Sequence, residues 1–245
     1  MVETEVIQHS IEAFRKNAKL VLFFSVPFLL SFAIPLLSPM PTYVSMGATF
    51  LRTGSMFIDL TYFDIGLIFI SSLASLFLIS FALVSINLVI KSQRTMTNIR
   101  TEVMEGIEKY TMNIFLLYTL TLVLSLAVLL LAHEYQMDDL ATPLFSFFVS
   151  LLLFYAPAAM VIDDLRPIEA MKMSLYMIRK KFLLFVLWLL VGFILLSVID
   201  EIFIILSSYI VWGRYVVLVL NAMLVMPFLV ILQTQSYLTK YTILR

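Results

Sequence analysis

Long uninterrupted apolar runs are the feature of this sequence that most limits its fold. Six of them occur, at about residues 20–37, 65–90, 112–132, 141–162, 182–199 and 215–236. A hydrocarbon core about 30 Å thick is crossed by ~20 residues of α-helix, so each run is long enough for one crossing. The runs are continuous rather than alternating, which excludes the strands of a membrane β-barrel. The pattern predicts an all-α polytopic membrane protein with six transmembrane helices.

The composition agrees with a bilayer environment. Apolar residues make up 62% of the 245 residues and charged residues 13%, whereas an ordinary soluble domain carries about 25% charged residues. Such a chain has too few charged side chains to cover a water-exposed surface, but its apolar side chains can face lipid. We therefore expect a single integral membrane domain over residues 1–245, with the first apolar run retained as a span.

The basic residues indicate the orientation of the chain. With six crossings, every Lys and Arg except Arg52 and Arg214 falls in segments on one side of the membrane. Basic residues concentrate in the cytoplasmic segments of membrane proteins. The expected location is the plasma membrane, with the N- and C-termini in the cytoplasm.

Three segments on that side are predicted to be amphipathic helices at the membrane interface, at about residues 5–19, 99–111 and 166–181. In the last of these, Pro167 suits the first turn of a helix, and apolar residues recur at spacings of three and four at Ile168, Met171, Leu175, Ile178 and Phe182. Such a helix buries its apolar stripe while its basic residues lie among the lipid headgroups. The basic residues expected at the interface are Arg15, Lys16, Arg179, Lys180 and Lys181.

The interfacial segments also indicate an internal repeat. A shift of 164 residues places Ser10 on Ser174, and the pair Arg15 and Lys16 on Arg179 and Lys180. A shift of 96 residues places Ser10 on Gly106, in a weaker copy. The sequence thus predicts three units, each an interfacial helix followed by a transmembrane hairpin. The alternative is that two amphipathic stripes leading into spans align by chance.

The segment Ala156–Ala170 carries a resemblance to a known family. It combines a proline between small residues at Pro157, the acids Asp163 and Asp164, a second proline at Pro167, and an Ala-x-x-x-Ser helix that leads into a span. This pattern resembles the glycerophosphoryl diester phosphodiesterase membrane-domain family and its bacterial and archaeal relatives. The resemblance implies a six-helix membrane domain that often occurs without a catalytic partner, and it supplies no functional residue.

The sequence contains no recognisable catalytic motif. Cysteine is absent and there are only six glycines, which form neither a dinucleotide-binding nor a phosphate-binding loop. His133 and Glu134 lack the second histidine of a zinc protease motif. We expect no enzyme, no cofactor and no metal site. Because the net charge is zero, nucleic acid is not an expected partner.

Polar residues in the spans are the remaining candidates for a binding site. Asn87 and Asn221 fall in the second and sixth spans. Each is expected to form an interhelical hydrogen bond, the alternative being a contact to a substrate.

Asp200 and Glu201 follow the fifth span, with Arg214 nearby as a partner. Either the span ends near Ile199 and a helix then follows the outer interface, which we favour because buried carboxylates are costly, or the span continues to about Leu206. The outer loop 38–63 is rich in aromatic residues and is expected to cover the outer mouth of the bundle or to lie on lipid.

Three functions fit these features. The favoured hypothesis is a non-enzymatic membrane protein that contacts lipid or an amphiphilic cargo in membrane homeostasis or export. The second is the permease subunit of an ABC-type exporter, which would bind an ATPase subunit through its cytoplasmic helices. The third is a structural or immunity-type protein that binds another membrane protein.

Overall fold

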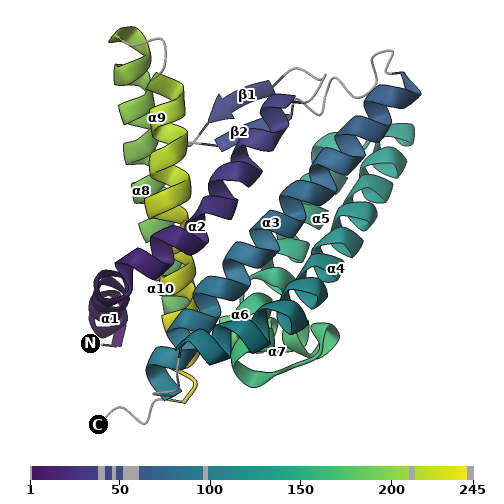
Figure 1. Cartoon of the computed structure of the whole chain (residues 1–245). Helices are drawn as coiled ribbons and strands as arrows, with labels where there is room; N and C mark the ends of the chain where they lie inside the picture. Colours follow the sequence, from purple (N-terminus) through teal and green to yellow (C-terminus); the bar gives the residue numbers. More distant parts are fainter. Residues whose placement is uncertain are drawn as a thin grey trace.

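A computed structural model describes residues 2–37, 42–45, 48–51, 61–95, 99–209 and 213–241. The chain is an all-α polytopic membrane protein with one short β-hairpin (Figure 1). Its elements are α1 (Val2–Lys16), α2 (Ala18–Ala33), the 3-10 turn η1 (Ile34–Leu37), β1 (Thr42–Ser45), β2 (Ala48–Leu51), α3 (Tyr62–Thr95), α4 (Ile99–Glu134), α5 (Asp138–Leu153), α6 (Ala156–Asp163), α7 (Pro167–Lys180), α8 (Phe182–Tyr209), α9 (Gly213–Leu220), the π-helical turn η3 (Asn221–Val225) and α10 (Met226–Leu238).

Five helical segments in the described part of the chain are long and apolar enough to cross a membrane: Tyr62–Thr95, Thr101–Glu134, Asp139–Asp163, Phe182–Ile205 and Tyr215–Leu238. A sixth is the bent pair Thr4–Lys16 and Ala18–Ala33. The 16 residues of α2 and the 4 of η1 extend about 32 Å together, which matches the hydrocarbon thickness. Five of the apolar runs predicted as spans lie within one of these segments, and the first run, 20–37, lies in α2 and η1.

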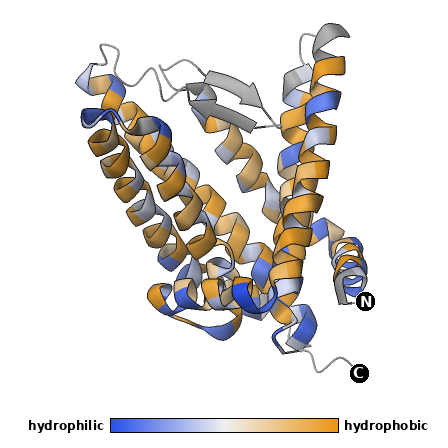
Figure 2. Cartoon of the chain, turned by 180° about the vertical axis from the view of Figure 1, so that it is seen from behind, coloured by the Kyte–Doolittle hydropathy of each residue, from blue (hydrophilic) through white to orange (hydrophobic). Residues whose placement is uncertain are grey.

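The outward faces of these helices are apolar (Figure 2). Phe23 on α2, Leu183 and Phe193 on α8 and Phe147 on α5 each expose more than half of their surface. In water such a surface would drive association or aggregation, whereas in a bilayer it faces lipid.

The helix α1 lies at 91° to α2, so that α1 runs across the end of the bundle. The bend is at Asn17, whose side-chain amide donates hydrogen bonds to the Ala13 carbonyl (3.1 Å) and to Gln93 Oε1 on α3 (3.0 Å). The face of α1 turned to the bundle consists of Val6, Ser10 and Ala13, and α1 packs mainly on α10. The segment predicted as the first interfacial helix is thus a helix separate from the first span, and its place at the membrane interface stays a prediction.

The helix α7 is the second separate helix of this kind, and it breaks from α8 at Lys181. Its buried face is formed by Ala170, Ser174, Met177 and Ile178. Only part of the predicted apolar stripe belongs to this buried face, because Ile168 and Phe182 at the two ends of the stripe are 69% and 58% exposed. The residues in the middle and last turns of α7 pack on protein, whereas Ile168 at the start of α7 and Phe182 at the start of α8 face outward.

The segment 99–111, predicted as a third interfacial helix, is instead the first part of the continuous helix α4. Gly106 lies so close to α3 that an added Cβ would be 2.7 Å from Leu88 Cδ2. This close packing along α3 keeps the segment in line with the rest of α4, and no proline interrupts it.

The structure places the predicted repeat positions in similar surroundings. Ser10, Gly106 and Ser174 are all buried, and the helix breaks at Asn17 and Lys181 are related by the same shift of 164 residues as the sequence copies. In the second copy the corresponding position is Asn113, and the helix is not broken there. The predicted repeat stays a prediction.

We use the term basic end for the end of the bundle formed by α1, α6, α7 and the adjoining ends of α3, α4 and α10. The helix α1 and the end of α10 lie there (Figure 1). The opposite end carries the hairpin, in which Thr42 pairs with Leu51 and Ser45 with Ala48. Residues 38–41, 46–47 and 52–60 lie outside the described residues, so the prediction that the loop 38–63 covers the bundle remains open. Tyr62 and Phe63, at the start of α3, are 95% and 77% exposed.

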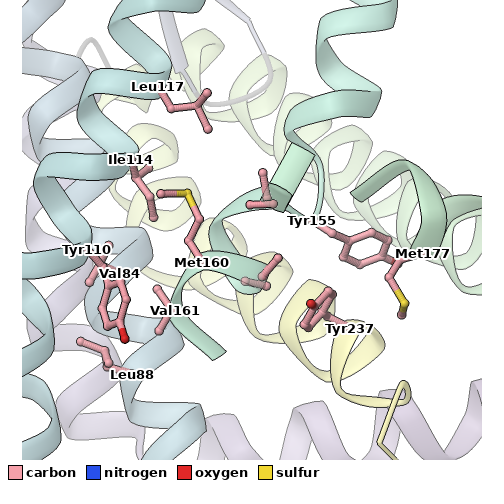
Figure 3. Packing of buried hydrophobic residues seen from close by; sticks show 14 of the residues in the cluster. Val84, Leu88, Tyr110, Ile114, Leu117, Tyr155, Met160, Val161, Met177 and Tyr237 are labelled. Carbon is pink, nitrogen blue, oxygen red and sulfur yellow. The ribbon is translucent and has the colours of Figure 1, made fainter. Parts of the chain in front are cut away.

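The best-packed part of the protein is also near the basic end. Every residue of α3 from Ala82 to Ile90 is buried, because α2, α4, α6 and α10 surround it. In the main core cluster, Met160 on α6 extends toward Ile114 on α4, and Tyr155 lies beside Met177 of α7 (Figure 3). Toward the opposite end the helices α8 and α9 diverge from α3, α4 and α5 (Figure 1).

Candidate functional site

A cavity of about 590 Å³ lies in the membrane-spanning part of the bundle. Its walls come from seven elements: α2, α3, α4, α5, α6, α8 and α10. Most of the lining is aliphatic or aromatic, including Phe28, Leu83 and Trp188. A few polar side chains also face it, namely Thr121, Ser125, Ser150 and Gln233. Small-molecule sites combine an apolar lining with a few polar groups in this way, and their volumes are about 300–1,000 Å³.

The fourth span is broken where it meets this cavity. The helix α5 ends at Leu153 and α6 begins at Ala156, with Pro157 in its first turn. Proline has no N–H and clashes with the preceding turn, which explains the break. Phe154 and Pro157, on either side of Tyr155, line the cavity.

The polar backbone groups at this break are bound by two side chains from other helices. Ser174 Oγ on α7 donates to the Leu151 carbonyl (2.8 Å) and accepts a hydrogen bond from the Tyr155 N–H (2.9 Å). Gln233 Nε2 on α10 donates to the Phe154 carbonyl. A break inside a membrane is stable only when neighbouring helices satisfy its backbone groups in this way.

The last span has a second irregularity beside the cavity. A π-helical turn, Asn221–Val225, separates α9 from α10, and Pro227 follows in the first turn of α10. Met226, directly after the π turn, lines the cavity. Single π turns in α-helices occur frequently at functional sites.

The helix α10, which contributes four residues to the cavity lining, forms hydrogen bonds to several other helices. Besides the bond from Gln233, its Leu229 carbonyl accepts from Trp188 Nε1 on α8 (2.8 Å). Thr234 Oγ1 donates to Asn87 Oδ1 on α3 (2.6 Å). These bonds connect α10 to α3, to α8 and to the break between α5 and α6. Asn87, a predicted candidate, is 1% exposed and thus forms an interhelical hydrogen bond outside the cavity lining.

At the basic end, the Asp163 carboxylate at the end of α6 binds the end of α10. Its carboxylate accepts hydrogen bonds from Tyr237 OH (2.6 Å), Lys240 Nζ (2.7 Å) and Tyr241 OH. The Asp163 side chain is only 7% exposed. Burial lowers the pKa of Lys240, but the hydrogen bond to Asp163 outweighs burial and raises that pKa above its ordinary value. The carboxylate therefore joins α6, α10 and the residues that follow α10.

The neighbouring Asp164 lies in a different environment. It adopts a left-handed backbone conformation (φ 55°) that ends α6, and its carboxylate pairs with Lys109 Nζ on α4 (2.6 Å). Both side chains are more than half exposed. The hydrogen bond from Lys109 lowers the pKa of Asp164 below its ordinary value. The two adjacent acids thus have separate partners. The Asp163 carboxylate is buried, and the pair of Asp164 with Lys109 is at the surface.

The structure does not bring the predicted outer residues into the cavity. The helix α8 is continuous from Phe182 to Tyr209, so the favoured prediction that a separate interfacial helix follows Ile199 is wrong. The 18 residues from Phe182 to Ile199 extend about 27 Å, close to the thickness of the hydrocarbon core, so Asp200 and Glu201 lie near the boundary of that core opposite the basic end. An unbroken apolar helix carries them there because nothing in Ile199–Leu206 stops an α-helix.

Two other candidates, Arg214 and Asn221, lie in α9 and at the start of the π turn that follows it. Asn221 is 2% exposed and begins the π turn. The side chain of Arg214 lies outside the described residues, so its predicted pairing with Asp200 or Glu201 is not tested. The basic residues predicted at the interface are in the last turns of α1 and α7 and just after α7, at the basic end, where Arg15, Lys16, Arg179 and Lys180 are exposed.

Three residues important in the cavity region were not among the predicted candidates: Gln233, Ser174 and Asp163. Ser174 and Asp163 were visible as parts of the motif around Ala156–Ala170. Gln233 begins the polar stretch Gln233–Thr234–Gln235–Ser236 at the end of the last span, which is unusual for a span interior. Within the described residues, no group of three or more His, Cys, Asp or Glu side chains is arranged to hold a metal ion.

Comparison with protein-family models, with curated proteins and with solved structures finds no match to this chain. The motif that carries the family resemblance nevertheless has a clear structural role. Pro157 begins α6, Asp163 and Asp164 bind neighbouring helices at its end, Pro167 begins α7, and Ser174 binds the broken span.

Proposed function

We propose that the protein binds an amphiphile, such as a lipid, in the cavity of about 590 Å³, and that it acts without catalysis in membrane homeostasis or export. The observation that carries the proposal is an apolar cavity at membrane depth beside two irregular spans. Substrate sites of membrane transporters are often built at broken helices near the middle of the bilayer. The aliphatic walls suit an acyl chain, and Gln233 and the hydroxyl groups suit a polar headgroup.

We further propose that the basic end lies in the cytoplasm and that the membrane is the plasma membrane. This orientation rests on the distribution of basic residues.

A permease subunit of an ABC-type exporter is the second candidate. The observation that favours it is the helix α1, which lies at 91° to the first span as an elbow at the membrane surface. The same cavity would then hold the cargo. A purely structural partner protein is less well supported, because a protein of that kind does not need a cavity in its centre.

The cavity proposal predicts that Ser125→Phe reduces the amount of lipid or amphiphile that copurifies with the protein at least several-fold. Ser125 lines the cavity, and a benzyl group there takes up space that a ligand needs. The measurement is native mass spectrometry of the protein released from mild detergent, with lipid extracts identified separately.

The matched control is Ser197→Phe, the same substitution at an exposed position of α8 that does not line the cavity. It should retain the ligand at the level of the wild-type protein. Equal retention by both variants, or a wild-type protein that carries no ligand, would contradict the proposal.

A further inference from the structure

A second pocket, of about 370 Å³, lies at the basic end between α1, the end of α3 and the end of α10. It shares no lining residue with the intramembrane cavity. Most of its lining is polar or charged, in contrast to the cavity. Because α1 runs across the end of the bundle at 91° to the first span, the pocket lies at the depth of the lipid headgroups.

One wall of this pocket is an edge of α1. Glu5, His9 and Glu12 recur at spacings of four and three, so they lie on one side of the helix. The adjacent face of α1, with Val6 and Ala13, is packed against the bundle. This packing turns the side of α1 that carries Glu5, His9 and Glu12 toward α3 and α10. Within the part of the chain that the structure describes, these three side chains form no hydrogen bond or ion pair with the protein.

The opposite wall supplies a cation and hydrogen-bond donors. Arg94 Nη1 on α3 donates to the Leu238 carbonyl of α10 (3.3 Å), which positions the guanidinium at the pocket. Gln93, Gln235 and Thr239 complete this wall. A guanidinium has five N–H donors in a planar arrangement that suits phosphate, and most of them remain for a ligand.

We propose that this pocket binds a headgroup that carries both a phosphate and a primary ammonium group. Its ammonium binds the carboxylates of Glu5 and Glu12, and its phosphate binds Arg94, with the amide side chains as further donors. A single anion would be repelled by the two carboxylates, and a single cation by the guanidinium. Only a ligand with both charges satisfies the two walls together.

The test is isothermal titration calorimetry on the full chain in detergent with glycerophosphoethanolamine. We expect the wild-type protein to bind it, and to bind glycerophosphoglycerol, which lacks the ammonium group, at least about tenfold more weakly because charge-assisted hydrogen bonds are lost. The double variant Glu5→Gln/Glu12→Gln should bind glycerophosphoethanolamine more weakly than the wild-type protein by the same factor. It should remain folded, since neither carboxylate binds another part of the described protein.

Two controls separate this proposal from others. Glu105→Gln/Glu108→Gln removes the same charge from exposed positions of α4 at the basic end and should not change binding. Ser125→Phe, which tests the intramembrane cavity, should not change it either, so the two proposals can fail independently. The proposal is overturned if the wild-type protein does not bind glycerophosphoethanolamine, if glycerophosphoglycerol binds equally well, or if Glu5→Gln/Glu12→Gln binds like the wild-type protein.

The source of the headgroup is decided in nanodiscs that contain equal amounts of phosphatidylethanolamine and phosphatidylglycerol. Retention of phosphatidylethanolamine by the wild-type protein, but not by Glu5→Gln/Glu12→Gln, identifies a lipid. Calorimetric binding without lipid retention supports the same recognition chemistry with a water-soluble phosphoethanolamine compound as ligand.

Discussion

Ser174→Ala is expected to lower the free energy of unfolding by about 2–4 kcal/mol, because it leaves two buried backbone groups without a partner and each such group costs about 1–3 kcal/mol. Ser174 is fully buried, and its hydroxyl group binds both the Leu151 carbonyl and the Tyr155 N–H at the break of the fourth span. The measurement is denaturant unfolding of the purified protein in detergent.

The control is Ser10→Ala, at the position that the predicted repeat places on Ser174. Ser10 is also fully buried, but its hydroxyl group donates only to the Val6 carbonyl four residues earlier in the same helix (2.7 Å). That carbonyl belongs to an intact helix, so we expect a loss below about 1 kcal/mol. If the two variants were equally stable, Ser174 would not hold the break.

The second large effect is expected from Asp163→Asn, with a loss of about 2–3 kcal/mol. The substitution removes the buried charge that Lys240 pairs with and weakens two hydrogen bonds from tyrosines. Breaking a fully buried ion pair costs about 3–5 kcal/mol, and the expected value is smaller because Lys240 is 24% exposed and can reach water.

The adjacent substitution Asp164→Asn provides the comparison. Asparagine tolerates the left-handed backbone conformation of this position, and the lost pair with Lys109 is at the surface, where ion pairs contribute about 0–1 kcal/mol. Thermal unfolding in detergent should separate the two variants clearly. A loss at Asp164 equal to that at Asp163 would show that the burial of the Asp163 cluster is not what stabilises the end of α10.

The helical spans were predictable because length and hydropathy alone decide whether a helix can cross a bilayer. The bends at Asn17 and Lys181 were predictable from amphipathic patterns that change into apolar runs. The continuity of α4 and α8 was not. The helix α4 continues through polar residues because it packs closely on α3 at Gly106. The helix α8 continues because no helix-breaking residue follows Ile199.

The candidate site was less predictable than the fold. A cavity results from how helices diverge, and no local pattern encodes that divergence. Asn87 was identified correctly as a source of an interhelical bond, but its partner Thr234 is 147 positions away. Ser174 and Gln233 act on a break that is visible in the sequence only as Pro157, so their roles depend on contacts that form after the chain folds.

A six-span bundle with its basic end in the cytoplasm is the central claim about the topology of the chain, and cysteine labelling tests it most directly because the chain has no cysteine of its own. Single variants Gln8→Cys and Lys172→Cys report on the basic end, and Glu134→Cys on the opposite end, all at exposed positions. In intact right-side-out membranes a membrane-impermeant maleimide should label only Glu134→Cys, and the other two should react after permeabilisation. Labelling of Gln8→Cys or Lys172→Cys before permeabilisation would contradict the placement of the basic end in the cytoplasm, and labelling of only one of the two would also contradict the predicted number of crossings.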